Sequence, residues 1–196
     1  MDPIILASSS PRRQEILKLL NIPFVVNPAN IDEKYPEDLP LENVAEYLAN
    51  EKVKAIIKSA PEGQTVPWIL GADTVIIFKG KIYGKPSSRE EAADFIRQFQ
   101  GNTHKVITGV AVYNSLDKKI VSRSSVNLVT LNKMSDKEID WYLDSDEWHD
   151  AAGAYKIQGL ASCFISKIEG SESSVMGLPI FDVYDILKSQ NYSIIE

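Results

Sequence analysis

The pattern of apolar and polar positions changes several times along the chain, and each change predicts a different element. Residues 4–7 (IILA) form a short apolar run that predicts a buried strand. Three serines follow, and then Pro11, a residue favoured at the first position of a helix. Residues 41–58 carry apolar side chains at close to helical spacing and predict a second helix. The chain therefore begins as strand, loop, helix and helix.

The next segment has the composition of strands. Residues 66–78 are rich in β-branched and aromatic side chains, but residues 71–74 (GADT) interrupt the run. We expect two strands separated by a polar interruption. Lys79 and Gly80 predict a hairpin turn that leads into a strand at residues 82–83.

Two serines mark the beginnings of further helices. Ser87 and Glu90 have capping-box spacing at the head of a helix that we expect to end near Gly101. Ser135 and Glu138 repeat this spacing ahead of an apolar run. Both patterns predict a helix that begins at a serine cap.

The remaining patterns complete the fold class. The patterns predict strands at residues 105–113, 120–131 and 161–168 and a final helix at residues 181–188. Helices and strands do not alternate strictly, so we expect an α/β fold with a mixed, partly antiparallel sheet. With no repeat or long linker, residues 1–196 are expected to form one domain, in one body or in two lobes around a cleft.

Charge and cysteine content restrict the class of protein. The 27 acidic and 21 basic side chains give a formal net charge of −6, which disfavours general binding to nucleic acid. Cys163 is the single cysteine and suits a reducing compartment. Without a signal-like start or a long apolar run, we expect a cytoplasmic protein that does not enter the membrane. A homodimer is a reasonable expectation, since cyclic dimers are the commonest assemblies.

Residues 8–13 (SSSPRR) are the first candidate for chemistry. Arg12 and Arg13 in the first turn of a helix oppose its dipole, which is unfavourable unless an anion binds there. Free N–H groups, serine hydroxyls and two guanidinium groups would together hold a phosphate. The alternative is that Ser10 merely caps the helix and that both arginines are solvated.

Asp73 is the second candidate, because it places a carboxylate directly after the apolar run 68–70. Carboxylates are seldom buried without a partner, so we expect Asp73 to bind a metal or to activate water. A turn or capping role is the alternative. Lys52 and Lys85 are further candidate cations, although each by itself could be a solvated surface charge.

The long aperiodic segment 146–159 is the last candidate. Its Gln158 offers amide donors and an acceptor that could read the edge of a base, or it could serve as a turn residue. His104 and His149 lack metal-ligand spacing, so we expect structural or solvated roles for both.

These segments together resemble the Maf family, whose motifs occur here in the same order. The motifs are residues 7–13 (ASSSPRR), 71–75 (GADTV), 84–86 (GKP), 104–110 (HKVITGV), 152–159 (AGAYKIQG) and 177–179 (GLP). The resemblance covers nearly the whole chain. It implies two α/β lobes around a central cleft, similar to inosine triphosphate pyrophosphatases, and hydrolysis of nucleoside triphosphates to the monophosphate and pyrophosphate.

The resemblance also implies roles for individual residues. Asp73 matches the family's proton acceptor, and Lys52 and Lys85 match polar positions that line the family's cleft. We expect these two lysines to assist catalysis by stabilising charge on the phosphates. The positions associated with substrate choice or binding are Ser8, Arg12, Arg13, Thr74 and Gln158. A divalent metal, Mg²⁺ or alternatively Mn²⁺, is expected at Asp73 and Glu33, although residues 31–34 (IDEK) could also be an ordinary acidic loop.

Residues 157–159 (IQG) resemble the corresponding motif of the Maf branch that acts on dTTP and UTP. The branch that acts on 7-methyl-GTP carries a Ser-Glu-Gly-like stretch at these positions. The chain departs from the family pattern at Ser9, where glycine is frequent, at Ala151, which replaces a lysine, and at residues 171–174, which lack a tyrosine. Three alternatives remain open: a preference for 7-methyl-GTP, a preference for modified pyrimidine nucleotides, and an interaction protein of cell division, since the family name is tied to septum inhibition.

Overall fold

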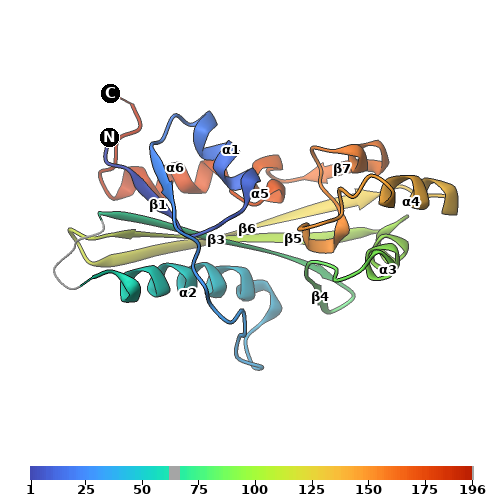
Figure 1. Cartoon of the computed structure of the whole chain (residues 1–196), viewed down its shortest axis with the longest axis horizontal. Helices are drawn as coiled ribbons and strands as arrows, with labels where there is room; N and C mark the ends of the chain where they lie inside the picture. Colours follow the sequence, from blue (N-terminus) through green and yellow to red (C-terminus); the bar gives the residue numbers. More distant parts are fainter. Residues whose placement is uncertain (62–66, 196) are drawn as a thin grey trace.

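A seven-stranded mixed sheet forms the centre of the molecule (Figure 1) in this computed structural model, which describes residues 1–61 and 67–195. The strand order is β2-β1-β3-β5-β6-β7, and β4 pairs with another part of β3. The strands are β1 Ile4–Leu6, β2 Phe24–Val26, β3 Trp68–Phe78, β4 Lys81–Tyr83, β5 Thr103–Asn114, β6 Lys119–Leu131 and β7 Ile165–Glu169. Strand β1 runs parallel to β2 and β3, and the other pairs are antiparallel. The prediction of an α/β fold with a mixed, partly antiparallel sheet is confirmed.

Helices cover both faces of this sheet (Figure 1). They are α1 Pro11–Leu19, α2 Val44–Ser59, α3 Arg89–Phe99, α4 Asp136–Leu143, α5 Glu172–Met176 and α6 Ile180–Ser189, with 3₁₀ turns at Leu41–Asn43, Ala152–Ala154 and Leu160–Phe164. Helix α2 lies along one face, α1, α5 and α6 lie on the other, and α3 and α4 pack at one end. Every helix in the described part of the chain is too short or too polar to span a lipid bilayer.

Apolar side chains gather at both ends of the long strands β3, β5 and β6. One cluster lies around α3 and α4 and includes the fully buried Phe99 and Tyr142. At the other end, Leu6 and Leu187 belong to a cluster beneath α1 and α6, and Val53 of α2 packs on the opposite face. The apolar core is therefore divided between the two ends of the sheet.

Two glycines allow α2 to lie unusually close to the sheet. A Cβ atom added to Gly71 of β3 would lie 2.4 Å from the carbonyl oxygen of Ala49, and one added to Gly109 of β5 would lie 2.3 Å from the backbone nitrogen of Glu46. Because these neighbours are backbone atoms, no rotamer change can relieve the contact. Gly109 is the register partner of Asp73, so the close approach of α2 occurs beside this carboxylate.

The predicted interruption of β3 is wrong. Residues 71–74 continue as strand and pair with β5, with Asp73 opposite Gly109 and Thr74 opposite Thr108. Gly71 serves close packing against α2, so its conformational freedom is not used to break the strand. Val66, the predicted first residue of this strand, lies outside the described residues.

Two further boundaries differ from the sequence-based expectations. Residues 160–164 form a 3₁₀ turn, and only Ile165–Glu169 is strand; the carboxylate of Glu147 accepts a hydrogen bond from the Leu160 N–H and so favours the turn. Helix α3 is capped by Ser88, whose hydroxyl accepts from the Glu91 N–H, one residue later than predicted. A short apolar run does not distinguish a 3₁₀ turn from a strand, and two adjacent serines do not show which of them caps the helix.

Most other predicted elements are confirmed within one or two residues. The capping box at Ser135 and Glu138 is present with both of its hydrogen bonds. Lys79 and Gly80 form the hairpin turn with positive φ angles of 48° and 73°. Strand β2 and helix α5 were not predicted, because a three-residue strand and a five-residue helix carry almost no periodic signal.

His104 of β5 has the structural role expected for it. Its side chain is buried, its ring stacks on Phe99 with centroids 4.5 Å apart, and its Nε2 lies 2.6 Å from the hydroxyl of Tyr155. Burial lowers the pKa of His104 from 6.5 to about 4. The folded state therefore favours the neutral imidazole.

Replacing Gly109 by Ala should destabilise the fold by roughly 1–3 kcal/mol, because the new methyl group would overlap the backbone of α2. The free energy of unfolding, measured by urea denaturation, tests this. Gly84→Ala is the matched control, since a Cβ there would meet nothing within 4 Å. Equal stabilities of the two variants would contradict the packing argument.

The contribution of His104 to stability should be complete above pH 6.5 and should decrease as the pH falls from 6.5 towards 4. The reason is that the unfolded state binds a proton in this window and the folded state does not. The loss should reach about 3 kcal/mol, at about 1.4 kcal/mol per pKa unit.

His104→Gln should therefore show a shallower decrease in unfolding free energy between these pH values than the wild type. His149→Gln, at an exposed histidine, should retain the wild-type slope; identical slopes in all three proteins would refute the assignment.

Candidate active site

The candidate site lies where one edge of β3 has no neighbouring strand. Strand β1 pairs with β3 at residues 68–70 and β4 pairs at residues 76–78, so within the described chain no strand pairs with this edge between them. The chain leaves β1 into the serine loop of residues 8–10 and leaves β4 towards Lys85. Both segments therefore begin at the borders of the uncovered edge.

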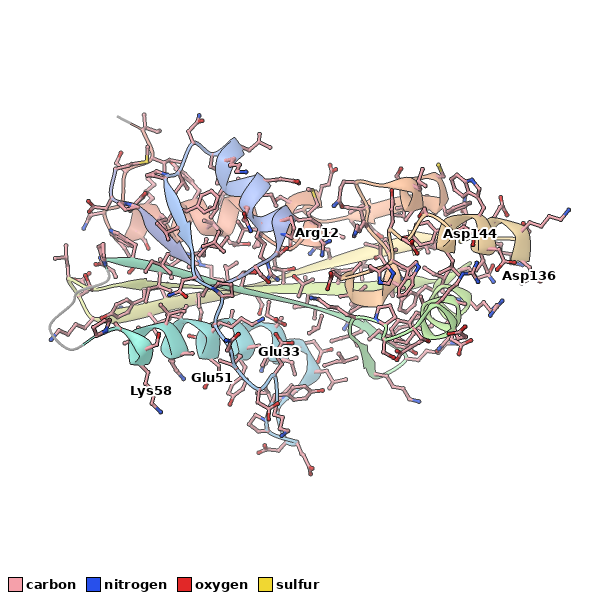
Figure 2. The ribbon with its side chains drawn as sticks, viewed as in Figure 1. Arg12, Glu33, Glu51, Lys58, Asp136 and Asp144 are labelled. Atoms are coloured by element: carbon pink, nitrogen blue, oxygen red, sulfur yellow. The ribbon has the colours of Figure 1, made fainter. Side chains whose placement is uncertain are left out.

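A pocket of about 650 Å³ surrounds this edge, a size typical of small-molecule sites. It is lined from both faces of the sheet, and Figure 2 shows Arg12 on one side of the strands and Glu33 on the other. The pocket contains every site residue predicted from the sequence: Ser8, Arg12, Arg13, Glu33, Lys52, Asp73, Thr74, Lys85 and Gln158.

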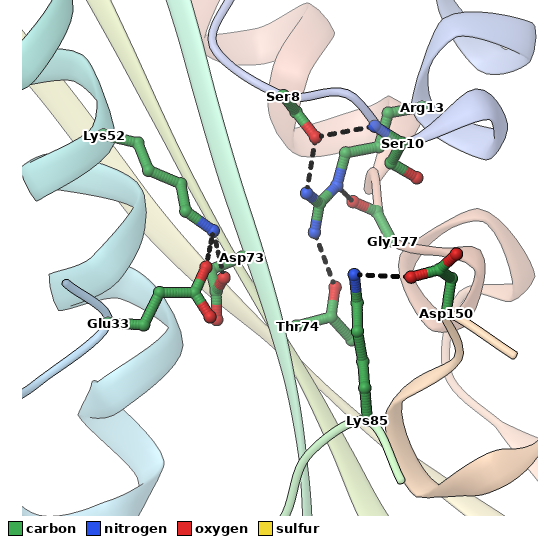
Figure 3. Close-up of polar contacts among 10 residues, drawn as sticks. All are labelled: Ser8, Ser10, Arg13, Glu33, Lys52, Asp73, Thr74, Lys85, Asp150 and Gly177. Carbon is green, nitrogen blue, oxygen red and sulfur yellow. Dashed lines mark hydrogen bonds and ion pairs between the residues drawn. The ribbon is translucent and has the colours of Figure 1, made fainter. Parts of the chain in front are cut away.

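On the α2 face, one ammonium group joins two carboxylates (Figure 3). The Nζ of Lys52 lies 2.5 Å from an Oδ1 of Asp73 and 2.8 Å from an Oε1 of Glu33. Lys52 and Asp73 are buried, whereas Glu33 comes from an exposed loop. The solvated alternative for Lys52 and the turn role for Asp73 are therefore wrong, because Asp73 lies within a continuous strand.

The two carboxylates respond differently to this environment. Burial raises the pKa of Asp73 above its ordinary value, and the positive charges of Lys52 and Arg13 only partly oppose the rise. For Glu33, desolvation would also raise the pKa, but the hydrogen bond and charge of Lys52, with Lys85 and Arg13, hold it below its ordinary value. Asp73 is therefore the more basic of the two carboxylates.

On the opposite face of β3, Arg13 is held by three neutral acceptors. Its Nε donates to the carbonyl of Gly177 at 2.8 Å, its Nη1 to the hydroxyl of Ser8 at 2.9 Å, and its Nη2 to the hydroxyl of Thr74 at 3.3 Å (Figure 3). Ser10 begins α1 without a side-chain cap hydrogen bond, so the alternative in which it merely caps the helix is wrong. Burial lowers the pKa of the Arg13 guanidinium from its high ordinary value, with the charge of Asp73 opposing the change.

Asp150 meets two further cations at the mouth of the pocket. Its backbone carbonyl accepts from Nη2 of Arg12 at 3.1 Å, and its Oδ1 lies 3.4 Å from Nζ of Lys85. The Gly153 N–H donates to the carbonyl of Gly84 at 2.9 Å, which fastens this loop beside Lys85. The loop of residues 146–159 is thus attached to the two segments that carry cations.

Gln158 is exposed and borders the pocket, so its amide can face a bound molecule. Several lining residues received no role from the sequence, and loops or the end of α5 bring them to the pocket: Asn30, Tyr35, Asp150, Lys156 and Met176. His104 lies in the core, and the exposed His149 stacks on Trp148 outside the pocket lining.

Asp73 and Glu33 are the carboxylates of the pocket that converge on one point. No group of three or more His, Cys, Asp or Glu side chains suited to a metal occurs among residues 1–61 and 67–195. The chain therefore offers two carboxylates, and other ligands of a metal would have to come from substrate or water.

Comparison with known proteins identifies the family of this chain. The model of the family described as "Maf-like protein" matches residues 3–190. A dTTP/UTP pyrophosphatase of Alkaliphilus oremlandii is 41% identical over 189 residues, covering 96% of each chain. Proteins of the same name are 38% identical in Pelotomaculum thermopropionicum, over 100% of each chain, and 40% identical in Escherichia coli, over 97% of this chain and 94% of the relative. With a family match over nearly its whole length and relatives of this similarity, the chain belongs to the Maf family.

Proposed function

We propose that this protein hydrolyses dTTP and UTP to the nucleoside monophosphate and pyrophosphate. The observation that carries the proposal is a single pocket in which the buried carboxylate of Asp73 and the buried guanidinium of Arg13 lie on opposite faces of one strand. Relatives that match the chain end to end bear the name dTTP/UTP pyrophosphatase. Modified pyrimidine nucleotides would undergo the same chemistry.

Asp73 is proposed to accept a proton from the water that attacks the α-phosphorus. An ordinary aspartate is a weak base, and the raised pKa of Asp73 makes it a better one. Lys52 holds the carboxylate at 2.5 Å and so determines where its oxygens point. Attack on the α-phosphorus breaks its bond to the bridging oxygen and releases pyrophosphate.

A divalent metal fits the pair Asp73 and Glu33. Oxygens of both carboxylates lie within 2.8 Å of one ammonium group, so they converge on a position that a cation can share. Mg²⁺ commonly binds through one or two carboxylates together with phosphate oxygens and water, which matches two protein ligands. When bound, Mg²⁺ or Mn²⁺ would supply Lewis-acid assistance to water activation and neutralise phosphate charge.

The cations of the pocket are proposed to bind the triphosphate. Arg13 is preorganised by its three hydrogen bonds, so it loses little freedom when an anion binds. Lys85 and Arg12 lie at the pocket mouth and contact Asp150 there. The positive charges of Arg12, Arg13 and Lys85 favour binding of a free nucleotide. The net charge of −6 on the whole protein disfavours binding of a nucleic-acid strand.

Gln158 is proposed to read the base. The edge of uracil or thymine presents one N–H donor between two carbonyl acceptors, and a side-chain amide can pair with such an edge through one donor and one acceptor. Its exposed position at the pocket border leaves the amide accessible. We also propose a cytoplasmic location, since the exposed free thiol of Cys163 suits a reducing compartment.

Hydrolysis of dTTP and UTP should be preferred over that of CTP, GTP and 7-methyl-GTP when pyrophosphate release is measured with Mg²⁺. Asp73→Asn should lower kcat by about 10²-fold or more, because the amide cannot accept the proton. Asp117→Asn, in the exposed turn between β5 and β6, should keep wild-type activity.

The outcomes of this panel are distinct. A preference for 7-methyl-GTP would leave the reaction standing but would overturn the base assignment. Retained activity in Asp73→Asn would refute the role of Asp73. A lack of hydrolysis of all five nucleotides would refute the proposed function and favour an interaction protein.

The pH profile should reveal Asp73 as the base. The carboxylate is active when ionised, so kcat/KM should fall by about tenfold per pH unit below its pKa. Because burial raises this pKa, the acidic limb of the profile should lie at higher pH than for an ordinary aspartate. The charge of Lys52 lowers the pKa of Asp73, so Lys52→Met should move the acidic limb to still higher pH. Profiles of log kcat/KM against pH test both statements.

Lys54→Met is the matched control for this shift. Lys54 lies on the same helix, exposed and paired with Glu51, so its removal should leave the position of the limb unchanged. If Lys52→Met lowered the rate without moving the limb, the proton acceptor would be a group other than Asp73.

A further inference from the structure

A chain of hydrogen-bonded hydroxyl groups lies beside Arg13, on the face of β3 opposite Asp73. Thr74 of β3 and Thr108 of β5 are register partners, and their Oγ1 atoms are 2.9 Å apart. Thr108 is fully buried, and its Oγ1 donates to the backbone carbonyl of Ser174 at 2.7 Å. Thr108 therefore lies between the pocket residue Thr74 and α5.

The direction of these hydrogen bonds follows from counting hydrogens. A threonine hydroxyl carries one hydrogen and two acceptor lone pairs, and a backbone carbonyl can only accept. Thr108 must use its one hydrogen for the Ser174 carbonyl. The hydrogen bond between the two threonines can then form only if Thr74 donates it. The hydrogen of Thr74 consequently points towards the core, and its lone pairs face Arg13.

This direction matters for Arg13 because the guanidinium needs an acceptor. Its Nη2 lies 3.3 Å from Oγ1 of Thr74, while Nε and Nη1 donate to Gly177 and Ser8. A guanidinium has five N–H groups, so these three bonds leave one N–H on each terminal nitrogen within the described residues. Those two N–H groups can bind an anion as a pair.

The far end of the hydroxyl chain is held rigidly. Ser174 is fully buried on α5, and its hydroxyl accepts from Nδ2 of Asn127 at 2.8 Å. The Oδ1 of Asn127 accepts from the Ser171 N–H at 2.8 Å. Because Gly177, which receives Nε of Arg13, follows directly after α5, one short helix positions both the Arg13 acceptor and the end of the threonine chain.

We propose that Thr108 is a positioning residue that turns the hydroxyl of Thr74 into a fixed acceptor for Arg13, and so keeps two N–H groups of Arg13 directed at the phosphates. Thr108 touches no substrate and acts only through Thr74. The kinetic part of this inference rests on the proposed nucleotide hydrolysis, and the hydrogen-bond direction does not.

Kinetics of threonine variants test the proposal. Thr108→Val removes the acceptor for the Thr74 hydrogen, so kcat for dTTP should fall about tenfold, the equivalent of one hydrogen bond, with a smaller change in KM. Thr108→Ser keeps the hydroxyl and should restore kcat to within about twofold of the wild type. Thr103→Val is the matched control, because Thr103 and Thr130 form an exposed hydroxyl pair at 2.8 Å on β5 and β6. It should leave kcat unchanged.

The double variant distinguishes positioning from a merely structural role. If Thr108 acts through Thr74, Thr108→Val should lower kcat in the wild type but should have no further effect in a Thr74→Val background. Full additivity of the two effects would overturn the proposal, as would a Thr108→Ser variant as impaired as Thr108→Val.

Neutron diffraction from crystals of the unmodified protein in D₂O provides a test that does not depend on activity or on variants that fold. Deuterium on Oγ1 of Thr74 should point at Oγ1 of Thr108, and that of Thr108 at the Ser174 carbonyl. Deuterium on Thr108 directed at Thr74 would overturn the inference. If the protein hydrolysed no nucleotide, the proposed function would fail, and these deuterium positions would still decide the hydrogen-bond direction.

Discussion

The contact between α2 and the two glycines of the sheet determines where the charged groups of the pocket lie. Gly71 and Gly109 allow helix backbone to approach at distances that any side chain would prevent. At this separation, Lys52 reaches Asp73 at 2.5 Å from the side of the helix that faces the sheet. A larger residue at either glycine would move the ammonium away from the carboxylate, so packing and electrostatics are set by the same contact.

The uncovered edge of β3 lets one pocket reach both faces of the sheet. Consecutive residues of a strand point to opposite faces, so Asp73 faces α2 while Thr74 faces α1 and α5. An ordinary interior strand would keep these two environments apart. Here no strand of the described chain pairs with the edge between β1 and β4, and one pocket reaches both. A carboxylate with a raised pKa and a buried guanidinium thus border the same space without forming a direct ion pair.

Charge compensation explains how so many ionised groups are tolerated there. Lys52 lies between Asp73 and Glu33, and Asp150 lies between Arg12 and Lys85. Lys52, Arg12 and Lys85 therefore each have an anionic or carbonyl partner in the protein, which offsets part of the cost of burial. A bound anion would compete for these cations, so their protein partners also influence the affinity for an anion.

Local patterns in the sequence were enough to predict most elements of this fold and several of the residues that line the pocket. Helical spacing, serine caps and apolar runs are local properties, and the ordered motifs around Ser8, Asp73 and Gln158 indicated the family. Only the three-dimensional structure reveals that β3 runs unbroken through Asp73, that Glu33 shares Lys52 with it, and that Thr108 and Asp150 contact residues of the pocket. These features depend on pairing between strands and helices distant in sequence, for which spacing along the chain carries no signal.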